Sequence, residues 1–327
     1  MASCGDPKPS PGIDDPSKVK FAKGADVSWV TQMERDGVKF YNSQGVEMEC
    51  MTLLKSLGMN SIRLRVWVNP VGGWNGKDDL LVKAKRAKAL GMRLMIDFHY
   101  SDSWADPGKQ NKPAAWADLP FKELKGALVA HTIEILEALK GEGIFPEWVQ
   151  VGNETSDGML WPDGRASVNM KGYTELHNAG YRAVKEVFPE AKVILHLAGG
   201  DNSPHYNWLL DGMAPYSAQY DIIGMSLYPE PNNWQYVNEA CLENMKALIK
   251  KYDKDIMICE VGMRWDQPEI CKGFIIDLID KALEKSDDRC LGVFYWEPEG
   301  FVNWSHYTKA AFDNGGRPTV ALDAFRD

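Results

Sequence analysis

Short apolar runs alternate with longer amphipathic stretches from residue 21 to the end of the chain. Each run spans about four to eight residues, a length that is typical of a strand buried on both faces. The runs begin near Phe21, Ser61, Met92, Trp148, Lys192, Asp221, Asp255 and Cys290. The pattern therefore predicts eight buried strands.

The stretches between the strands carry apolar residues at three- and four-residue spacing, which is typical of helices with one buried face. The candidates are Val46–Leu57, Leu80–Leu90, Phe121–Leu139, Tyr173–Val187, Glu239–Ile249 and Cys271–Leu283. Two of them end at a glycine, Gly58 or Gly91, that runs directly into the next strand. Glycine accepts the left-handed conformation that ends a helix, so these two positions indicate helix termini.

Strands that alternate with helices pair in parallel, and eight such units favour closure into a single (β/α)8 barrel. We expect this domain to span residues 21–327. An open, doubly wound sheet is the alternative fold. Its phosphate-binding Gly-x-Gly-x-x-Gly turn is missing after the first strand, where residues 24–29 read Gly-Ala-Asp-Val-Ser-Trp.

Residues 1–20 differ in composition, with four prolines among Ser, Asp, Lys and Gly. Such a segment buries little apolar surface, so we expect a flexible tail. Cys4 at the head of this proline-rich segment resembles the lipid-bearing cysteine of a mature bacterial lipoprotein. This hypothesis places the protein outside the cell or at the bacterial cell surface.

The net charge of -9, with only 37 basic residues, argues against nucleic acid and anionic membranes as partners. It also favours a neutral polymer over a polyanionic one as the ligand. No apolar run approaches the roughly 20 residues of a membrane span. We expect a monomer without a membrane-spanning segment.

The six cysteines include no Cys-x-x-Cys pair and no close Cys/His cluster, which makes a structural zinc site improbable. Most of them lie in apolar strands or helices and are expected to be buried free thiols. Cys259 and Cys290 lie in the last two predicted strands and could be neighbours, and their pairing stays open. No metal or cofactor is expected.

Polar and aromatic residues gather where the predicted strands end, the edge at which a (β/α)8 barrel builds its active site. They are Asp26, Trp29, Arg65, Trp67, Asp97, His99, Asn153, Glu154, Tyr228, Glu260, Trp296 and Glu297. The fifth strand offers only His196, and a lone histidine in an apolar run is typical of a core residue. The gathering predicts a functional site at this edge.

Two of these strand ends carry a glutamate beside a glycine, Gly152-Asn153-Glu154 and Glu260-Val261-Gly262. Each glutamate could merely cap the following helix. At one edge of a barrel, however, the two carboxyl groups could face each other across a pocket. Such a pair can hydrolyse glycosidic bonds, because one acid protonates the leaving oxygen while the other attacks the anomeric carbon or activates water.

Eight tryptophans lie at the strand ends or in the loops that follow: Trp29, Trp67, Trp74, Trp104, Trp161, Trp234, Trp265 and Trp296. Flat indole faces suit the apolar face of a pyranose. Any one of these rings could instead pack the loops. Their number on one rim favours a carbohydrate ligand.

Five motifs carry a resemblance to a known family: residues 24–28, 62–67, 97–107, 151–154 and 259–262. The longest, Asp-Phe-His-Tyr-Ser-Asp-Ser-Trp-Ala-Asp-Pro, is also the most specific. With these motifs the chain resembles the endo-β-1,4-galactanases of glycoside hydrolase family 53, within a clan of retaining (β/α)8 glycosidases.

The resemblance implies that Glu154 is the acid/base and Glu260 the nucleophile of an enzyme that cleaves β-1,4-galactan, the neutral side chain of pectin, within the chain. Asn153 is expected to bind the sugar 2-hydroxyl. Arg65 and Tyr228 are expected to contact Glu260, with Arg65 keeping it ionised. The other expected substrate-binding residues are Asp26, His99, Asp102, Trp104 and Trp296.

Some bacterial relatives hold calcium through an Asp-x-Asp-x-His-x-Asn run after the seventh strand, and residues 262–269 contain no such run. The loops after strands seven and eight also look short, which leaves the number of sugar subsites open. Two alternatives remain: an endo-glycanase of the same clan that acts on mannan or β-glucan, and a non-catalytic glycan-binding protein. The second would have no need of both glutamates.

Overall fold

Eight parallel strands close into a barrel in the described part of the chain, residues 21–326 of the computed structural model. They are β1 (Ala22–Asp26), β2 (Ser61–Val66), β3 (Arg93–Phe98), β4 (Trp148–Val151), β5 (Lys192–Leu197), β6 (Ile222–Leu227), β7 (Asp255–Val261) and β8 (Cys290–Trp296). Each strand begins within one residue of its predicted start, and β8 pairs with β1. The predicted (β/α)8 fold is confirmed. The expected tail, with Cys4, lies outside the described residues.

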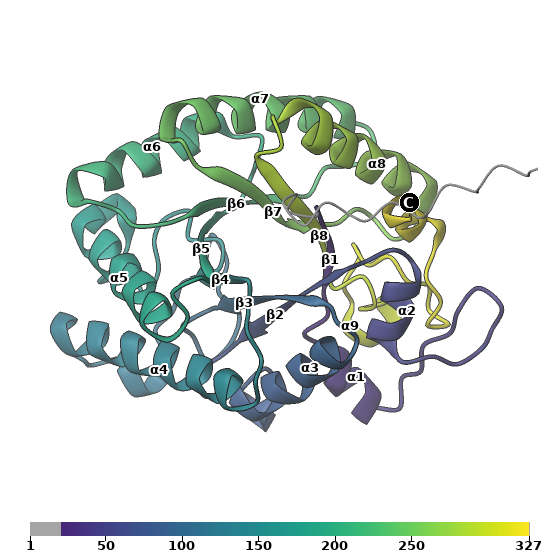
Figure 1. The fold of residues 1–327 in the computed structure, drawn as a ribbon, viewed down its shortest axis with the longest axis horizontal. Coiled ribbons are helices and arrows are strands. Elements are labelled where there is room, and N and C mark those ends of the chain that lie inside the picture. The colour runs from purple at the N-terminus through teal and green to yellow at the C-terminus, as the bar shows by residue number, and fades with distance from the viewer. Residues whose placement is uncertain (1–20, 327) are drawn as a thin grey trace, which may run out of the picture.

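Helices surround the strands, as Figure 1 shows. They are α1 (Val30–Arg35), α2 (Cys50–Ser56), α3 (Lys77–Ala89), α4 (Phe121–Gly141), α5 (Ala166–Val187), α6 (Ser203–Met213), α7 (Trp234–Tyr252), α8 (Pro268–Lys285) and α9 (Val302–Ser305). All six predicted helices are present. The sequence pattern misses α1 and α9, which are too short to show a period, and α6, which follows a glycine- and asparagine-containing stretch.

Local chemistry explains where these helices begin and end. Helix α2 begins at Cys50 rather than at Val46, because the Glu49 carboxylate accepts the backbone N–H groups of Met51 and Thr52 at 3.1 and 2.7 Å. Gly58 has a φ angle of +96° and Gly91 one of +66°. The predicted glycine ends of α2 and α3 are therefore confirmed.

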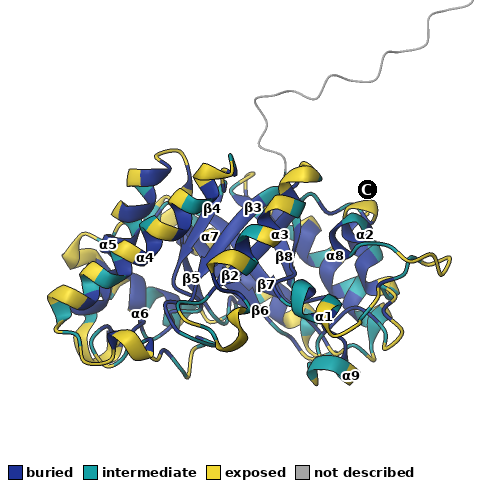
Figure 2. Ribbon diagram, turned by 90° about the horizontal axis from the view of Figure 1, so that it is seen from below, coloured by how far each residue is buried: buried dark blue, intermediate teal, exposed yellow. Residues whose placement is uncertain are grey.

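The inside of the barrel changes from apolar to charged along the strands. Away from the carboxyl ends it is filled by Ala22, Met95, Trp148, Ile194, Ile222, Met257, Cys259 and Phe294. The Trp148 and Phe294 rings meet edge to face at 6.1 Å. Nearer the carboxyl ends, Asp26, Arg63, Asp97 and Gln150 are fully buried instead. Figure 2 shows the buried strands at the centre, within a layer of helices whose outer faces are exposed.

The five cysteines of the described residues are all buried and free. They are Cys50, Cys241, Cys259, Cys271 and Cys290. The expectation of buried free thiols is confirmed for these five, and Cys259 does not pair with Cys290.

The segment after β8 returns to the barrel beside α1, where Figure 1 shows the yellow α9. Trp304 of α9 donates its indole N–H to Asp36 at 3.1 Å. Farther along, the Tyr295 hydroxyl donates to the backbone carbonyl of Lys309 at 2.9 Å. Because the segment is bonded both to the end of α1 and to β8, it forms a fixed wall at the carboxyl ends of the strands.

Candidate active site

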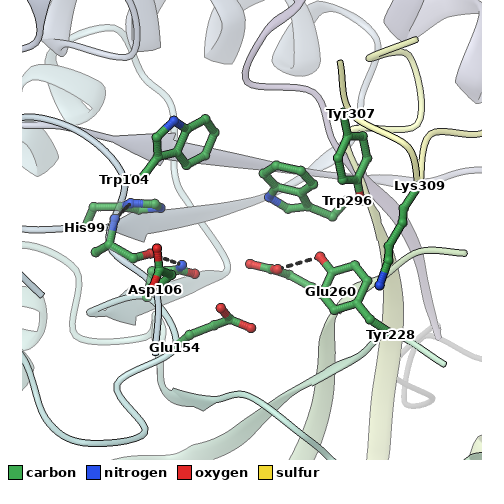
Figure 3. A pocket seen from close by; sticks show the side chains of 11 residues that line it. His99, Trp104, Asp106, Glu154, Tyr228, Glu260, Trp296, Tyr307 and Lys309 are labelled. Carbon is green, nitrogen blue, oxygen red and sulfur yellow. Dashed lines mark hydrogen bonds between the residues drawn. The ribbon is translucent and has the colours of Figure 1, made fainter. Parts of the chain in front are cut away.

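A cavity of about 280 Å³ lies at the carboxyl ends of the strands. Seven of the ten predicted site residues line it: His99, Trp104, Asn153, Glu154, Tyr228, Glu260 and Trp296. Figure 3 shows the carboxyl groups of Glu154 and Glu260 pointing into the same space. The structure therefore brings together the two glutamates that end β4 and β7.

Arg63 of β2 organises the side chains beneath this cavity. Its guanidinium is fully buried and donates to Gln150 Oε1 (2.6 Å), Asp26 Oδ2 (2.7 Å), Asn153 Oδ1 (2.8 Å) and Asp97 Oδ2 (2.9 Å). It also forms an ion pair with Glu260 Oε1 at 2.9 Å. Burial lowers the pKa of Arg63, but the surrounding carboxylates, Asp97 first, raise it well above its ordinary value. A permanently charged, planar group thus fixes the positions of side chains from four strands.

The expected contact between Arg65 and Glu260 is wrong. Arg65 is fully buried, forms an ion pair with Glu297 and lies 3.7 Å from Asp26 Oδ1. Arg63 and Arg65 are two residues apart and share the inner face of β2. Arg65 stands nearer the carboxyl end, where its side chain meets the residue after β8. Arg63 makes the contact with Glu260 that sequence analysis assigned to Arg65.

The Arg65 guanidinium sits among tryptophans. It lies 4.3 Å from the ring centroid of Trp104 and 5.4 Å from those of Trp29 and Trp67, distances at which a cation attracts an aromatic face. Trp104 in turn meets Trp296 edge to face at 5.7 Å. Trp104 and Trp296 therefore face the cavity, while Trp29 and Trp67 support them from behind.

Two acids that were predicted to bind substrate, Asp26 and Asp102, do not line the cavity, and neither does Arg65. Asp26 is fully buried, and its Oδ1 accepts the backbone N–H and the hydroxyl of Ser28 at 3.0 and 2.5 Å. Asp102 accepts the backbone N–H groups of Asn69 at 2.9 Å and Ala114 at 2.8 Å. Backbone or interior donors occupy both carboxylates, which therefore help to hold the strand end and the loop. Their contact with substrate stays a prediction.

Glu154 has an unusual backbone, with a φ angle of +43°. A non-glycine residue in this left-handed region costs on the order of 1–3 kcal/mol, so surrounding contacts must hold it. His196 Nδ1 accepts its N–H at 3.3 Å, and the His196 carbonyl accepts the N–H of Thr155 at 2.8 Å. Gln110 donates to the carbonyl of Asn153 at 2.8 Å. His196 is fully buried, which confirms its predicted place in the core.

The two glutamates have different neighbours. Glu260 pairs with Arg63 at 2.9 Å and accepts the Tyr228 hydroxyl at 2.7 Å, whereas Glu154 forms no ion pair with any residue between 21 and 326. Burial raises the pKa of both carboxyl groups, and the charge of Glu154 raises that of Glu260 further. The pair therefore keeps one proton at neutral pH. Arg63 and Tyr228 favour the ionised form of Glu260, so we expect the shared proton on Glu154.

His99 forms a rigid part of the opposite wall. Its Nε2 lies 3.0 Å from Asp97 Oδ2, and its Nδ1 accepts the backbone N–H of Ala105 at 3.0 Å. Burial opposes the ionisation of Asp97, but the charge of Arg63 lowers the pKa of Asp97 to about 2. An ionised Asp97 therefore fixes Nε2 of His99 as the donor and holds the ring in one orientation.

Asp106, Tyr307 and Lys309 also line the cavity and are not among the predicted site residues. Asp106 belongs to the long third-strand motif. The pKa of Glu154 is raised mainly by the burial of Glu154, and the charge of Asp106 raises it further. The position of this residue in the motif could have identified it. Tyr307 and Lys309 follow β8 in a stretch without any period, and no sequence signal marks them.

Within residues 21–326, no cluster of three or more His, Cys, Asp or Glu side chains could hold a metal ion. In the stretch after β7, Arg264 and Asp266 instead form an exposed ion pair at 2.6 Å. Carboxyl groups, an imidazole, an amide, an ammonium group and aromatic rings are thus the chemistry that the described cavity offers.

Comparison with known proteins identifies the family, since the model of glycosyl hydrolase family 53 matches residues 22–272. The chain belongs to this family. The endo-beta-1,4-galactanase of Bacillus subtilis (strain 168) is 33% identical to this family 53 chain over 307 residues. The match covers 85% of this chain and 70% of that protein. The arabinogalactan endo-beta-1,4-galactanase of Thermothelomyces thermophilus is 32% identical over 336 residues, 93% and 98% of the two chains.

A solved structure agrees with the family assignment. The family 53 catalytic domain of Ignisphaera aggregans matches this fold with a TM-score of 0.86 at 32% identity, over 97% of this chain and 99% of that one. The family resemblance carried by the five sequence motifs is therefore confirmed.

The raised pKa of Glu154 predicts a stability that depends on pH. Below about pH 4, the carboxyl group is protonated in both the folded and the unfolded chain. As the pH rises, the unfolded chain releases the proton first, so the folded state loses stability. Glu154→Gln removes this loss because the amide stays neutral. We expect the melting temperature of the variant to match that of the wild type near pH 4 and to exceed it at pH 8, as measured by circular dichroism.

Glu134→Gln on α4 is the matched control for this measurement. Lys77 lies 2.6 Å from Glu134 and lowers its pKa, so this substitution should lower the melting temperature slightly at pH 8. If the melting temperature of Glu154→Gln exceeded that of the wild type by the same amount at both pH values, the raised pKa of Glu154 would be contradicted.

Proposed function

We propose that this protein hydrolyses internal β-1,4-galactosidic bonds of galactan and of type I arabinogalactan with retention of anomeric configuration. The observation that carries the proposal is a pair of glutamates in one cavity, of which only Glu260 is held by a cation and a phenol. Membership of family 53 and the names of its galactanase relatives support the choice of polysaccharide and linkage.

In the first step, a carboxylate oxygen of Glu260 forms a bond to the anomeric carbon while the bond to the leaving oxygen breaks. Glu154 donates its proton to that oxygen, so the leaving chain departs as a neutral alcohol. Arg63 and Tyr228 hold the attacking carboxylate ionised and oriented. The product of this step is a galactosyl ester of Glu260.

In the second step, Glu154 takes a proton from water as that water attacks the anomeric carbon, and the ester bond to Glu260 breaks. The ester carries no charge. Glu154 therefore no longer faces a neighbouring carboxylate, and its pKa falls at the stage at which it must act as a base. Two inversions at the same carbon return the original configuration.

The cavity walls fit a bound galactosyl unit. Asn153 Nδ2 donates to the Ala105 carbonyl at 2.8 Å, which leaves its second hydrogen for the sugar 2-hydroxyl. Trp104 and Trp296 offer aromatic surface to the sugar. Covering roughly 100 Å² of ring at about 25 cal/mol/Å² contributes on the order of 2.5 kcal/mol.

A panel of neutral polymers tests the substrate. Reducing ends should appear rapidly from β-1,4-galactan and not from mannan, β-glucan or xylan, with mixed oligosaccharides as the early products. Activity on mannan or β-glucan instead would keep the mechanism and reject galactan as the substrate. No activity on any of the four would favour a glycan-binding protein.

Azide distinguishes the roles of the two glutamates. Glu154→Ala and Glu260→Ala should each lower turnover by at least about 10²–10⁴-fold. Azide should then rescue both variants, giving the β-galactosyl azide with Glu154→Ala and the α-azide with Glu260→Ala, as read by proton NMR. The reverse pair of anomers would exchange the two roles, and near-normal turnover of either variant would remove that residue from the mechanism.

We propose that the protein lies outside the cell or at the bacterial cell surface, with a lipid on Cys4. The support for this placement is the proline-rich composition of residues 1–20. Within the described residues, no helix is long and apolar enough to cross a membrane. Mass spectrometry of the protein from its native membrane should find acyl groups on Cys4, and an unmodified thiol there would contradict the anchor.

A further inference from the structure

Lys309 is the one lysine or arginine among the described residues that line the cavity, and the mechanism above does not use it. Its side chain extends along Tyr228, with Nζ 5.0 Å from the centroid of the phenol ring. The hydroxyl of the same ring donates to Glu260 at 2.7 Å. A positive charge therefore stands beside the phenol that holds the attacking carboxylate.

The backbone holds this lysine in place. The Tyr295 hydroxyl, from β8, donates to the Lys309 carbonyl at 2.9 Å, and the preceding residue, Thr308, accepts the backbone N–H of Trp265 at 2.9 Å. The segment is thus tied to the residues that follow β7 and to β8 itself. The ammonium group is presented to the cavity from a fixed point rather than from a free loop.

The ammonium group has no acceptor among the residues that the structure describes. It forms no ion pair and no hydrogen bond with any side chain between residues 21 and 326, although Lys309 is partly buried. Partial burial lowers the pKa of Lys309, and the charge of Glu230 offsets this effect only in part. The three N–H donors are therefore available to a ligand whose oxygens enter the cavity.

We infer that Lys309 donates hydrogen bonds to hydroxyl oxygens of the sugar unit that becomes bonded to Glu260. This inference rests on the proposed function. Figure 3 shows Lys309 and Tyr228 on one side of Glu260, and Glu154, which serves the leaving oxygen, on the other. A neutral sugar offers only hydroxyl and ring oxygens, and an ammonium donor makes the stronger, charge-assisted kind of hydrogen bond to them.

Lys309→Met tests this inference, since methionine keeps the apolar stem and removes the charge. We expect kcat/KM to fall about 10–100-fold, the effect of losing a hydrogen bond to a charged group. The fall should be equal on galactan and on an aryl β-1,4-galactobioside. The aryl substrate has the same glycone but a non-sugar leaving group, so an equal loss places the contact on the glycone side.

Two variants control the measurement. Lys309→Arg keeps a cation and should recover part of the activity, whereas Lys246→Met should leave activity unchanged, because Lys246 is an exposed residue of α7 that pairs with Glu243 at 2.9 Å. Melting temperatures show whether each variant is folded. Wild-type kcat/KM in a folded Lys309→Met variant overturns the inference. A loss on galactan alone also overturns it, because the contact would then lie with the leaving chain.

Tyr228→Phe separates a sugar contact from an indirect effect through the phenol. If Lys309→Met lowers kcat/KM by the same factor in the Tyr228→Phe background as in the wild type, the lysine acts on the sugar. If its effect disappears there, Lys309 only positions Tyr228 and the inference is wrong. Should the wild type cleave mannan or β-glucan instead of galactan, the proposed substrate fails, and the same variants measured on that polymer with its matching aryl glycoside still decide the role of Lys309.

Discussion

A buried guanidinium is the constraint on which the catalytic end of this barrel depends. Taking an ion out of water costs several kcal/mol unless acceptors surround it, so Arg63 can occupy the interior only because acids from several strands meet around it. Asp26, Asp97 and Glu260 supply that charge. One cation offsets only part of the charge of three carboxylates. Burial raises the pKa of Glu154, and the charges of Asp106 and Asp97 raise it further against the opposing charge of Arg63. Asp97 therefore helps both to hold Arg63 and to maintain the proposed acid.

A second arginine organises the walls rather than the reacting groups. Arg65 is anchored to Glu297 and surrounded by three indole rings, of which Trp104 is the nearest. The ring that faces the cavity is thus oriented by a cation behind it, and Trp296 rests against that ring. The direction of the two rings proposed to bind sugar therefore follows from buried electrostatics, because the rings cannot turn without exposing or displacing an interior charge.

The repeating apolar pattern was enough to predict the barrel and the meeting of Glu154 with Glu260, because all strand ends of a closed parallel barrel face the same opening. It could not decide between Arg63 and Arg65. These residues share one face of β2, because side chains alternate along a strand with a period of two. That alternation does not tell which of the two arginines contacts Glu260 of β7 and which contacts Glu297 after β8. Strand stagger and side-chain direction decide this. Lys309 lies in a segment without any period, so only its path in space places it in the cavity.

His196 shows that a core residue and a site residue can be the same residue. A lone histidine in an apolar strand predicts a buried ring with satisfied hydrogen bonds, and Ser226 Oγ at 2.8 Å and the N–H of Glu154 satisfy it. That N–H belongs to the residue with the left-handed backbone. Because the strain of this conformation must be balanced by contacts within the core, the position of the proposed catalytic acid is set by barrel packing. At a strand end, interior residues therefore position the residues of the site as well as stabilising the fold.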